Sequence, residues 1–167
     1  LEMGWRWPDL HDLVLKLKDM PMTLETLWAL DALTRDERPK VNMGTGRIGL
    51  DLHYWGMKNQ DPYVRRWSVK MIGEQDRDAN DLIRLAKTEK HPEVRAQILA
   101  TAKRLPAASA LPLLWAGEAD DVSGHLPLLA WWALESKAEK EREAVFAFLK
   151  SDAAFLKTKL FHDHLAE

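Results

Sequence analysis

A repeated helix-start pattern constrains the fold of this chain more than any other feature of its sequence. Asp61-Pro-Tyr-Val-Arg65 and His91-Pro-Glu-Val-Arg95 share the pattern x-Pro-x-Val-Arg and lie about thirty positions apart, which is the length of one helical hairpin. Proline at the first helical position gives up no backbone donor that the helix needs, and Asp61 can cap the first copy. Each copy therefore predicts a helix that starts at its proline.

Apolar residues behind each proline follow helical spacing. They are Val64, Trp67, Met71 and Ile72 in the first copy and Val94, Ile98, Ala102 and Leu105 in the second. A third, degenerate copy begins at Gly124-His-Leu-Pro127, where Leu129 and Trp132 match Val64 and Trp67. Residues with this spacing lie on one face of a helix, so we expect Trp67, Ile98 and Trp132 to be buried.

The segments between the copies read as return helices. We expect these at residues 78–87, 107–116 and 140–150. A weaker copy at 21–30 precedes a turn-rich connection at 35–46 and a helix at 47–58, and further helices are expected at 8–18 and 152–163. Stacked hairpins share a core that none of them forms alone. The sequence thus predicts an all-α fold: a single domain over residues 1–167, a HEAT-like α-solenoid of about four helical hairpins. Because the chain opens at Leu1, we expect it to be excised from a longer protein.

Composition narrows the classes of function. Apolar residues make up 46% and charged residues 30% of the 167, which indicates a folded chain. The absence of cysteine excludes disulfides, thiolate zinc sites and cysteine nucleophiles. A formal net charge of −2 disfavours nucleic acid as a partner.

The segment from Asp61 to Leu134 resembles a known family. Asp61-Pro-Tyr-Val-Arg-Arg-Trp-Ser-Val and His125-Leu-Pro-Leu-Leu-Ala-Trp-Trp-Ala-Leu-Glu135 carry the likeness, and the second run is its most specific part. They are similar to the HEAT-like region of large haem-binding, membrane-bound dehydrogenase-like proteins of planctomycetes and verrucomicrobia. In that family a β-propeller and a Cys-x-x-Cys-His motif carry the redox chemistry. The resemblance implies a spacer between redox domains of an exported or periplasmic parent protein.

Motifs that could carry chemistry lack their required context. Gly44-Thr-Gly-Arg-Ile-Gly49 matches a dinucleotide-binding pattern, but no full strand precedes it and no acidic residue follows about twenty positions on. His162 and His164 are two apart and would point to different sides of a helix. We therefore assign no catalytic residue, no cofactor and no metal to this chain.

Two groups of residues suit structural and binding roles. Arg65 and Arg95 occupy matching repeat positions, where a guanidinium can bind carboxylates or helix-end carbonyls of the next hairpin, so we expect a structural ladder. A candidate partner surface on the return helices consists of His53, Trp55, Arg84, Lys87 and Trp115, residue types enriched in binding hot spots. The alternative for Trp55 and Trp115 is that they fill the core between the layers.

The function favoured by these observations is a non-catalytic scaffold or protein-interaction module, with flanking domains or another subunit as the partner. The alternative is a HEAT-like DNA-binding protein or alkylbase DNA glycosylase, suggested by the arginines and tryptophan of Val64-Arg-Arg-Trp67. A face that binds a duplex needs clustered Lys and Arg, which distinguishes the two hypotheses.

Overall fold

The computed structural model describes residue 16 and residues 22–35, 53–73, 80–118 and 125–166. Throughout these ranges the regular elements are helices and no strand occurs, so the predicted all-α class is confirmed. The chain forms two compact units, Leu1–Ser68 (unit 1) and Val69–Glu167 (unit 2), and their boundary falls within helix α4 (Pro62–Gly73). The prediction of a single domain stays a prediction.

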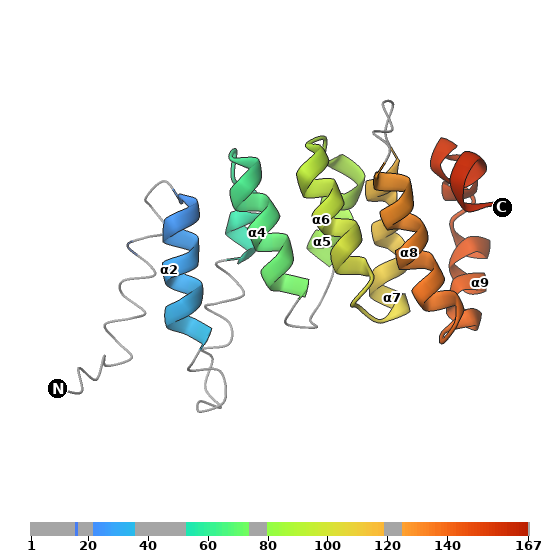
Figure 1. The fold of residues 1–167 in the computed structure, drawn as a ribbon, viewed down its shortest axis with the longest axis horizontal. Helices are drawn as coiled ribbons and strands as arrows, with labels where there is room; N and C mark the ends of the chain where they lie inside the picture. The colour runs from blue at the N-terminus through green and yellow to red at the C-terminus, as the bar shows by residue number, and fades with distance from the viewer. Residues whose placement is uncertain (1–15, 17–21, 36–52, 74–79, 119–124, 167) are drawn as a thin grey trace. The chain divides into compact units, whose positions relative to one another are not determined.

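Unit 1 contains helix α2 (Leu24–Arg35), a helical turn at 53–56 and the first part of α4 (Figure 1). The Thr23 hydroxyl accepts a hydrogen bond from the Thr26 backbone N–H at 3.3 Å and so caps the start of α2. Asp61 caps α4 in the same way, with Oδ1 2.8 Å from the Tyr63 backbone nitrogen, and Pro62 is the first helical residue. The predicted helix start at Pro62 is therefore confirmed.

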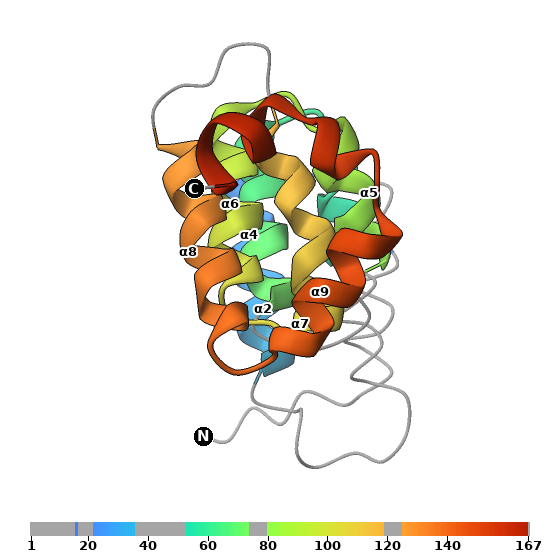
Figure 2. The ribbon, with the colours of Figure 1, turned by 90° about the vertical axis from the view of Figure 1, so that its right-hand side faces the viewer.

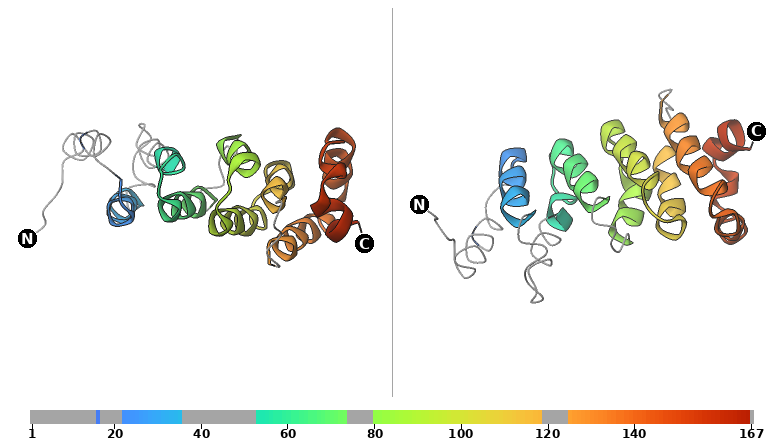
Figure 3. Two further views of the ribbon diagram at one scale, coloured as in Figure 1. Left: turned by 90° about the horizontal axis from the view of Figure 1, so that it is seen from above. Right: turned by 60° about the horizontal axis from the view of Figure 1, so that its bottom comes forward.

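Unit 2 consists of short helices in hairpin order. They are α5 (Asn80–Thr88), α6 (Pro92–Ala102), α7 (Ala107–Ala110), the 3-10 helix η1 (Leu111–Gly117), α8 (Leu126–Ala138), α9 (Arg142–Ser151), the 3-10 helix η2 (Phe155–Lys157) and the π-helix η3 (Phe161–Leu165). Within this unit α6 packs beside α8, while η1 packs between α5 and α9 (Figure 2). Figure 3 shows these two layers from above, with α6 and α8 in one and α5, η1 and α9 in the other.

The core of unit 2 lies between those layers. Its fully buried side chains include Ile98 and Leu99 on α6, Leu113 and Leu114 on η1, and Phe155 on η2. Each such aliphatic side chain contributes about 1.5–3 kcal/mol through burial. The predicted burial of Ile98 is confirmed, whereas Trp67 in unit 1 is only half-buried.

The register predicted for the third repeat copy is wrong. Trp132 is 42% exposed and Trp131 37% exposed, because the buried stripe of α8 instead follows Leu126, Ala130 and Leu134. This stripe matches Val94, Ile98 and Ala102 of α6, so Leu126 occupies the place of the repeat valine. Pro127 is the second residue of α8 rather than the first, and an alignment anchored on proline shifts the third copy by three positions.

The return helices start close to the predicted positions. The helix type differs from the prediction at 107–116, and the helix predicted at 152–163 is not continuous. Residues 107–116 are helical, yet the part from Leu111 onward is a 3-10 helix, since Pro112 has no N–H for an α-helical hydrogen bond. The predicted continuous helix at 152–163 is broken at Thr158, whose backbone is extended at φ −70°, ψ 150°. The predictions for residues 8–15, 36–46, 47–52 and the glycine motif at 44–49 lie outside the described residues.

Candidate interaction surface

Arg65 and Arg95 both use their guanidinium groups on backbone carbonyls, in different settings. In unit 1, Arg65 Nη1 donates to the carbonyls of Asn59 and Gln60, each at 2.9 Å, in the loop that precedes α4. In unit 2, Arg95 Nε donates to the carbonyl of Ala116 at 2.7 Å, and Nη2 donates to that of Glu118. Arg95 thus satisfies the carboxyl-terminal end of η1, the return helix of its own hairpin, and its side chain is buried.

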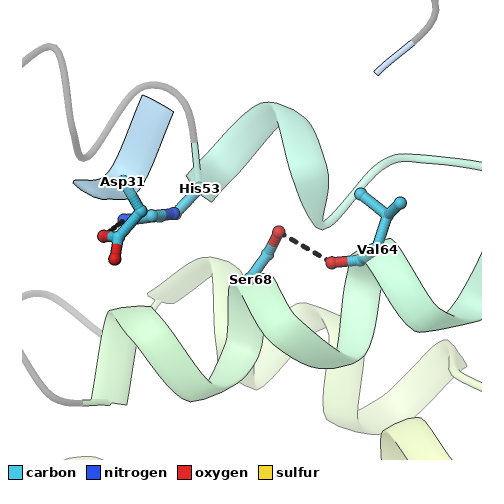
Figure 4. Close-up of polar contacts among 4 residues, drawn as sticks. All are labelled: Asp31, His53, Val64 and Ser68. Carbon is cyan, nitrogen blue, oxygen red and sulfur yellow. Dashed lines mark hydrogen bonds and ion pairs between the residues drawn. The ribbon is translucent and has the colours of Figure 1, made fainter. Parts of the chain in front are cut away.

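The unit 1 members of the candidate partner surface do not form an exposed site. His53 is wholly buried, so its assignment to a recognition surface is wrong. Its Nε2 lies 3.4 Å from Oδ1 of the buried Asp31 on α2, as Figure 4 shows. Trp55 is half-buried. The sequence around His53 does not predict this burial, because its partner Asp31 is distant in the chain.

The unit 2 members lie on the layer of return helices. Lys87 is exposed and places its ammonium group 5.5 Å from the ring centroid of Trp115, which is a cation–π distance. Trp115 is half-buried; its Nε1 donates to Asp152 Oδ2 at 2.9 Å, and its ring packs edge-on against Phe155. Arg84 is exposed and paired with Asp81 on the same helix. The structure brings Lys87 and Trp115 together, and the indole of Trp115 contacts Lys87, Asp152 and Phe155 within unit 2.

A cluster of exposed large apolar side chains in unit 2 lies instead on α8, where the sequence prediction placed core. Leu128, Trp131 and Trp132 are 46%, 37% and 42% exposed. Their spacing of i, i+3, i+4 puts them on one side of the helix, opposite the buried stripe. We call these three residues the α8 outer face. Lys103 at the end of α6 borders it, with its ammonium group 5.5 Å from the ring centroid of Trp132.

A second aromatic group lies in unit 1. Trp28 on α2 and Trp67 on α4 meet edge-to-face with ring centroids 5.2 Å apart, and Trp28 remains 41% exposed. Such pairs contribute about 0.5–1.5 kcal/mol beyond their burial. Trp67 therefore has a packing role within its own unit.

Lys137 and Glu141 in unit 2 form hydrogen bonds with backbone groups at the ends of helices. Lys137 on α8 is buried and donates from Nζ to the Lys103 carbonyl at 3.0 Å. Burial lowers the pKa of Lys137, although the nearby Glu141 carboxylate acts in the opposite direction. Glu141 in turn accepts a hydrogen bond from the Ala107 backbone N–H, at 3.0 Å for the closer oxygen. These two side chains hold the turn between α6 and α7.

Among the described residues, no group of three or more His, Cys, Asp or Glu side chains could hold a metal ion, and His162 and His164 are both exposed. No helix within the described ranges is long and apolar enough to cross a membrane. Comparison of the chain with protein-family models, curated proteins and solved structures gives no match.

Proposed function

We propose that this chain is a HEAT-type helical-repeat module that binds another protein and catalyses no reaction itself. The observation that carries the proposal is the α8 outer face. Helix α8 is apolar on both sides, since Leu126, Ala130 and Leu134 face the core while the outer face is open to solvent. A helix that is apolar all round is normally enclosed by other structure, and an exposed apolar patch on a protein is a common mark of an interface.

The magnitude of this exposure is large enough to support binding. Trp131 and Trp132 each leave about 100 Å² uncovered, taking about 250 Å² as the full area of a tryptophan side chain. At about 25 cal/mol per Å², covering one of them is worth about 2.5 kcal/mol. This value lies in the range of interface hot spots, where tryptophan is enriched.

The packing of unit 2 supports the repeat assignment. Helices α6 and α8 carry the same buried spacing and lie side by side, and Lys137 of α8 donates to the Lys103 carbonyl at the end of α6, which links consecutive hairpins. The further proposal that the partner is a redox domain of a larger dehydrogenase-like protein rests on the family resemblance of Asp61–Leu134 alone.

The residues that suggested a DNA-binding protein or glycosylase have other tasks in the structure. Arg65 donates to two loop carbonyls, and Trp67 packs against Trp28. With a net charge of −2 on the whole chain, protein is the favoured partner class.

Site-specific photo-crosslinking in cells that express this chain tests the proposal. A photoreactive phenylalanine analogue would replace Leu128 on the α8 outer face, and Ala108, an exposed residue of α7, would serve as the control position. We expect a discrete protein adduct from position 128 that disappears when Trp131 and Trp132 are both changed to serine. An adduct that forms equally at position 108, or none at position 128, would refute the proposed function.

A further inference from the structure

One acidic side chain binds the start of the segment from Lys159 to Leu165. The Glu118 carboxylate accepts hydrogen bonds from the backbone N–H groups of Lys159 at 3.3 Å and Leu160 at 2.9 Å. A carboxylate at the amino-terminal end of a helical segment is favourable because several N–H groups there lack partners within the helix. The Thr158 hydroxyl satisfies one more such group by accepting from the Phe161 N–H at 3.1 Å.

Few side chains anchor this segment to the rest of unit 2. Leu160 and Leu165 are buried, while Lys159, His162, Asp163 and His164 are exposed. Leu160 lies against Gly117 and Ala130: a Cβ atom on Gly117 would stand 2.6 Å from Leu160 Cδ2 and 3.2 Å from the Ala130 Cβ. The segment also packs on α8, the helix that carries the α8 outer face.

Glu118 has a second connection through its backbone. Its carbonyl accepts from Arg95 of α6, so one residue is bound both to the second repeat copy and to the end of the chain. Segments with few buried apolar contacts open locally at a lower free energy than core helices. Here the free energy of that opening depends on the Glu118 carboxylate, on two buried leucines and on Phe161, whose half-buried ring lies 6.0 Å from that of Phe155 between centroids.

We propose that residues 159–165 form a detachable strap latched by the Glu118 carboxylate, and that its release uncovers apolar surface around Gly117 and Ala130, on the side of α8 opposite the α8 outer face. The proposal rests on the proposed function for its biological meaning, because the uncovered surface extends the area open to a protein partner. The strap itself is a property of the fold and is measured without any partner.

Hydrogen exchange with mass spectrometry on the full chain tests the strap. In the unmodified chain, we expect the amides of Lys159 and Leu160 to exchange at least about tenfold faster than those of Ile98 and Leu99 in α6. Glu118→Ala should accelerate the strap amides by a further tenfold or more, because each hydrogen bond to a charged group contributes substantially. Glu135→Gln, an exposed glutamate on α8, is the matched control and should change nothing.

Three results would overturn the strap. One is equal exchange of strap and α6 amides in the unmodified chain, which means that they open only together. Another is acceleration of α6 by the same factor as the strap in Glu118→Ala, which means global destabilisation. Leu160→Ala provides a second variant that leaves the latch intact, and failure of that change to accelerate the strap selectively also contradicts the proposal.

The uncovered surface has its own readout. Binding of the apolar dye 1-anilinonaphthalene-8-sulfonate to Glu118→Ala should exceed binding to the unmodified chain by about twofold or more, since exposed apolar surface binds this dye. A strap that opens without added dye binding would refute the claim about the uncovered surface. Neither experiment depends on the photo-crosslinking result, so the strap and the proposed function can fail separately.

Discussion

Replacement of Arg95 by alanine is the sharpest test of how α6 is joined to η1, the return helix of its hairpin. The Arg95 side chain is 6% exposed and donates to the carbonyls of Ala116 and Glu118 at the end of η1. A hydrogen bond to a charged group contributes about 1.5–3 kcal/mol, and loss of the donor leaves carbonyls without a partner. We therefore expect Arg95→Ala to lower the free energy of unfolding of unit 2 by about 3–5 kcal/mol.

The assay is hydrogen exchange in a urea series, read on peptides from α6 and α8 so that unit 1 does not contribute. Arg104→Ala is the matched control: Arg104 lies just beyond the same helix, is exposed, and donates at 3.4 Å to the Thr101 hydroxyl. Its loss should cost about 0.5 kcal/mol or less. Arg95→Lys should fall between the two, because one ammonium group cannot reproduce the fork of the guanidinium. If Arg95→Ala costs no more than Arg104→Ala, the idea that Arg95 joins α6 to η1 is refuted.

Three further predictions concern packing and charge. Gly117→Ala should cost about 1–3 kcal/mol, measured by urea unfolding, because its Cβ would overlap Leu160, and a cost near zero would show that Leu160 moves freely. Trp132→Ala should change stability by less than about 1 kcal/mol while Ile98→Ala costs about 2–4 kcal/mol; equal costs would contradict the register of α8. Because burial lowers the pKa of Lys137, the unfolded chain binds more protons between that lowered pKa and the ordinary lysine pKa of about 10.4. The free energy of unfolding contributed by Lys137 should therefore rise with pH across this alkaline window, and Lys137→Met should remove that rise in pH-dependent urea titrations.

The sequence was most informative where local chemistry decides the structure. Asp61 followed by Pro62 predicts a capped helix start, and the structure has that hydrogen bond. Proline did not predict the register of α8 correctly, because it is tolerated at more than one position of the first turn of a helix. Leu126 stands one residue before Pro127 and takes the buried place, which turns Trp132 to the outside.

Sequence reasoning was least informative for the candidate partner surface, where contacts between distant residues decide which side chains are buried. Buried His53 lies against Asp31 on α2. Asp31 precedes it by 22 positions, and no short-range sequence pattern connects the two residues. Exposure of Trp131 and Trp132 also depends on which neighbouring helices cover α8, and apolar periodicity alone does not distinguish a covered face from an open one. One feature of the sequence did indicate an exposed apolar face, because α8 is apolar at positions all around its axis.

The bonds that run from one hairpin to the end of another have a consequence for protein engineering. Lys137 of α8 completes the end of α6 and Glu141 completes the start of α7, while Arg95 of α6 completes η1 within its own hairpin. A cut made between hairpins would therefore leave helix ends without their donors or acceptors on both fragments. Designers who wish to shorten, duplicate or transplant pieces of this chain should treat residues 92–141 as one indivisible module, although a single hairpin is much shorter.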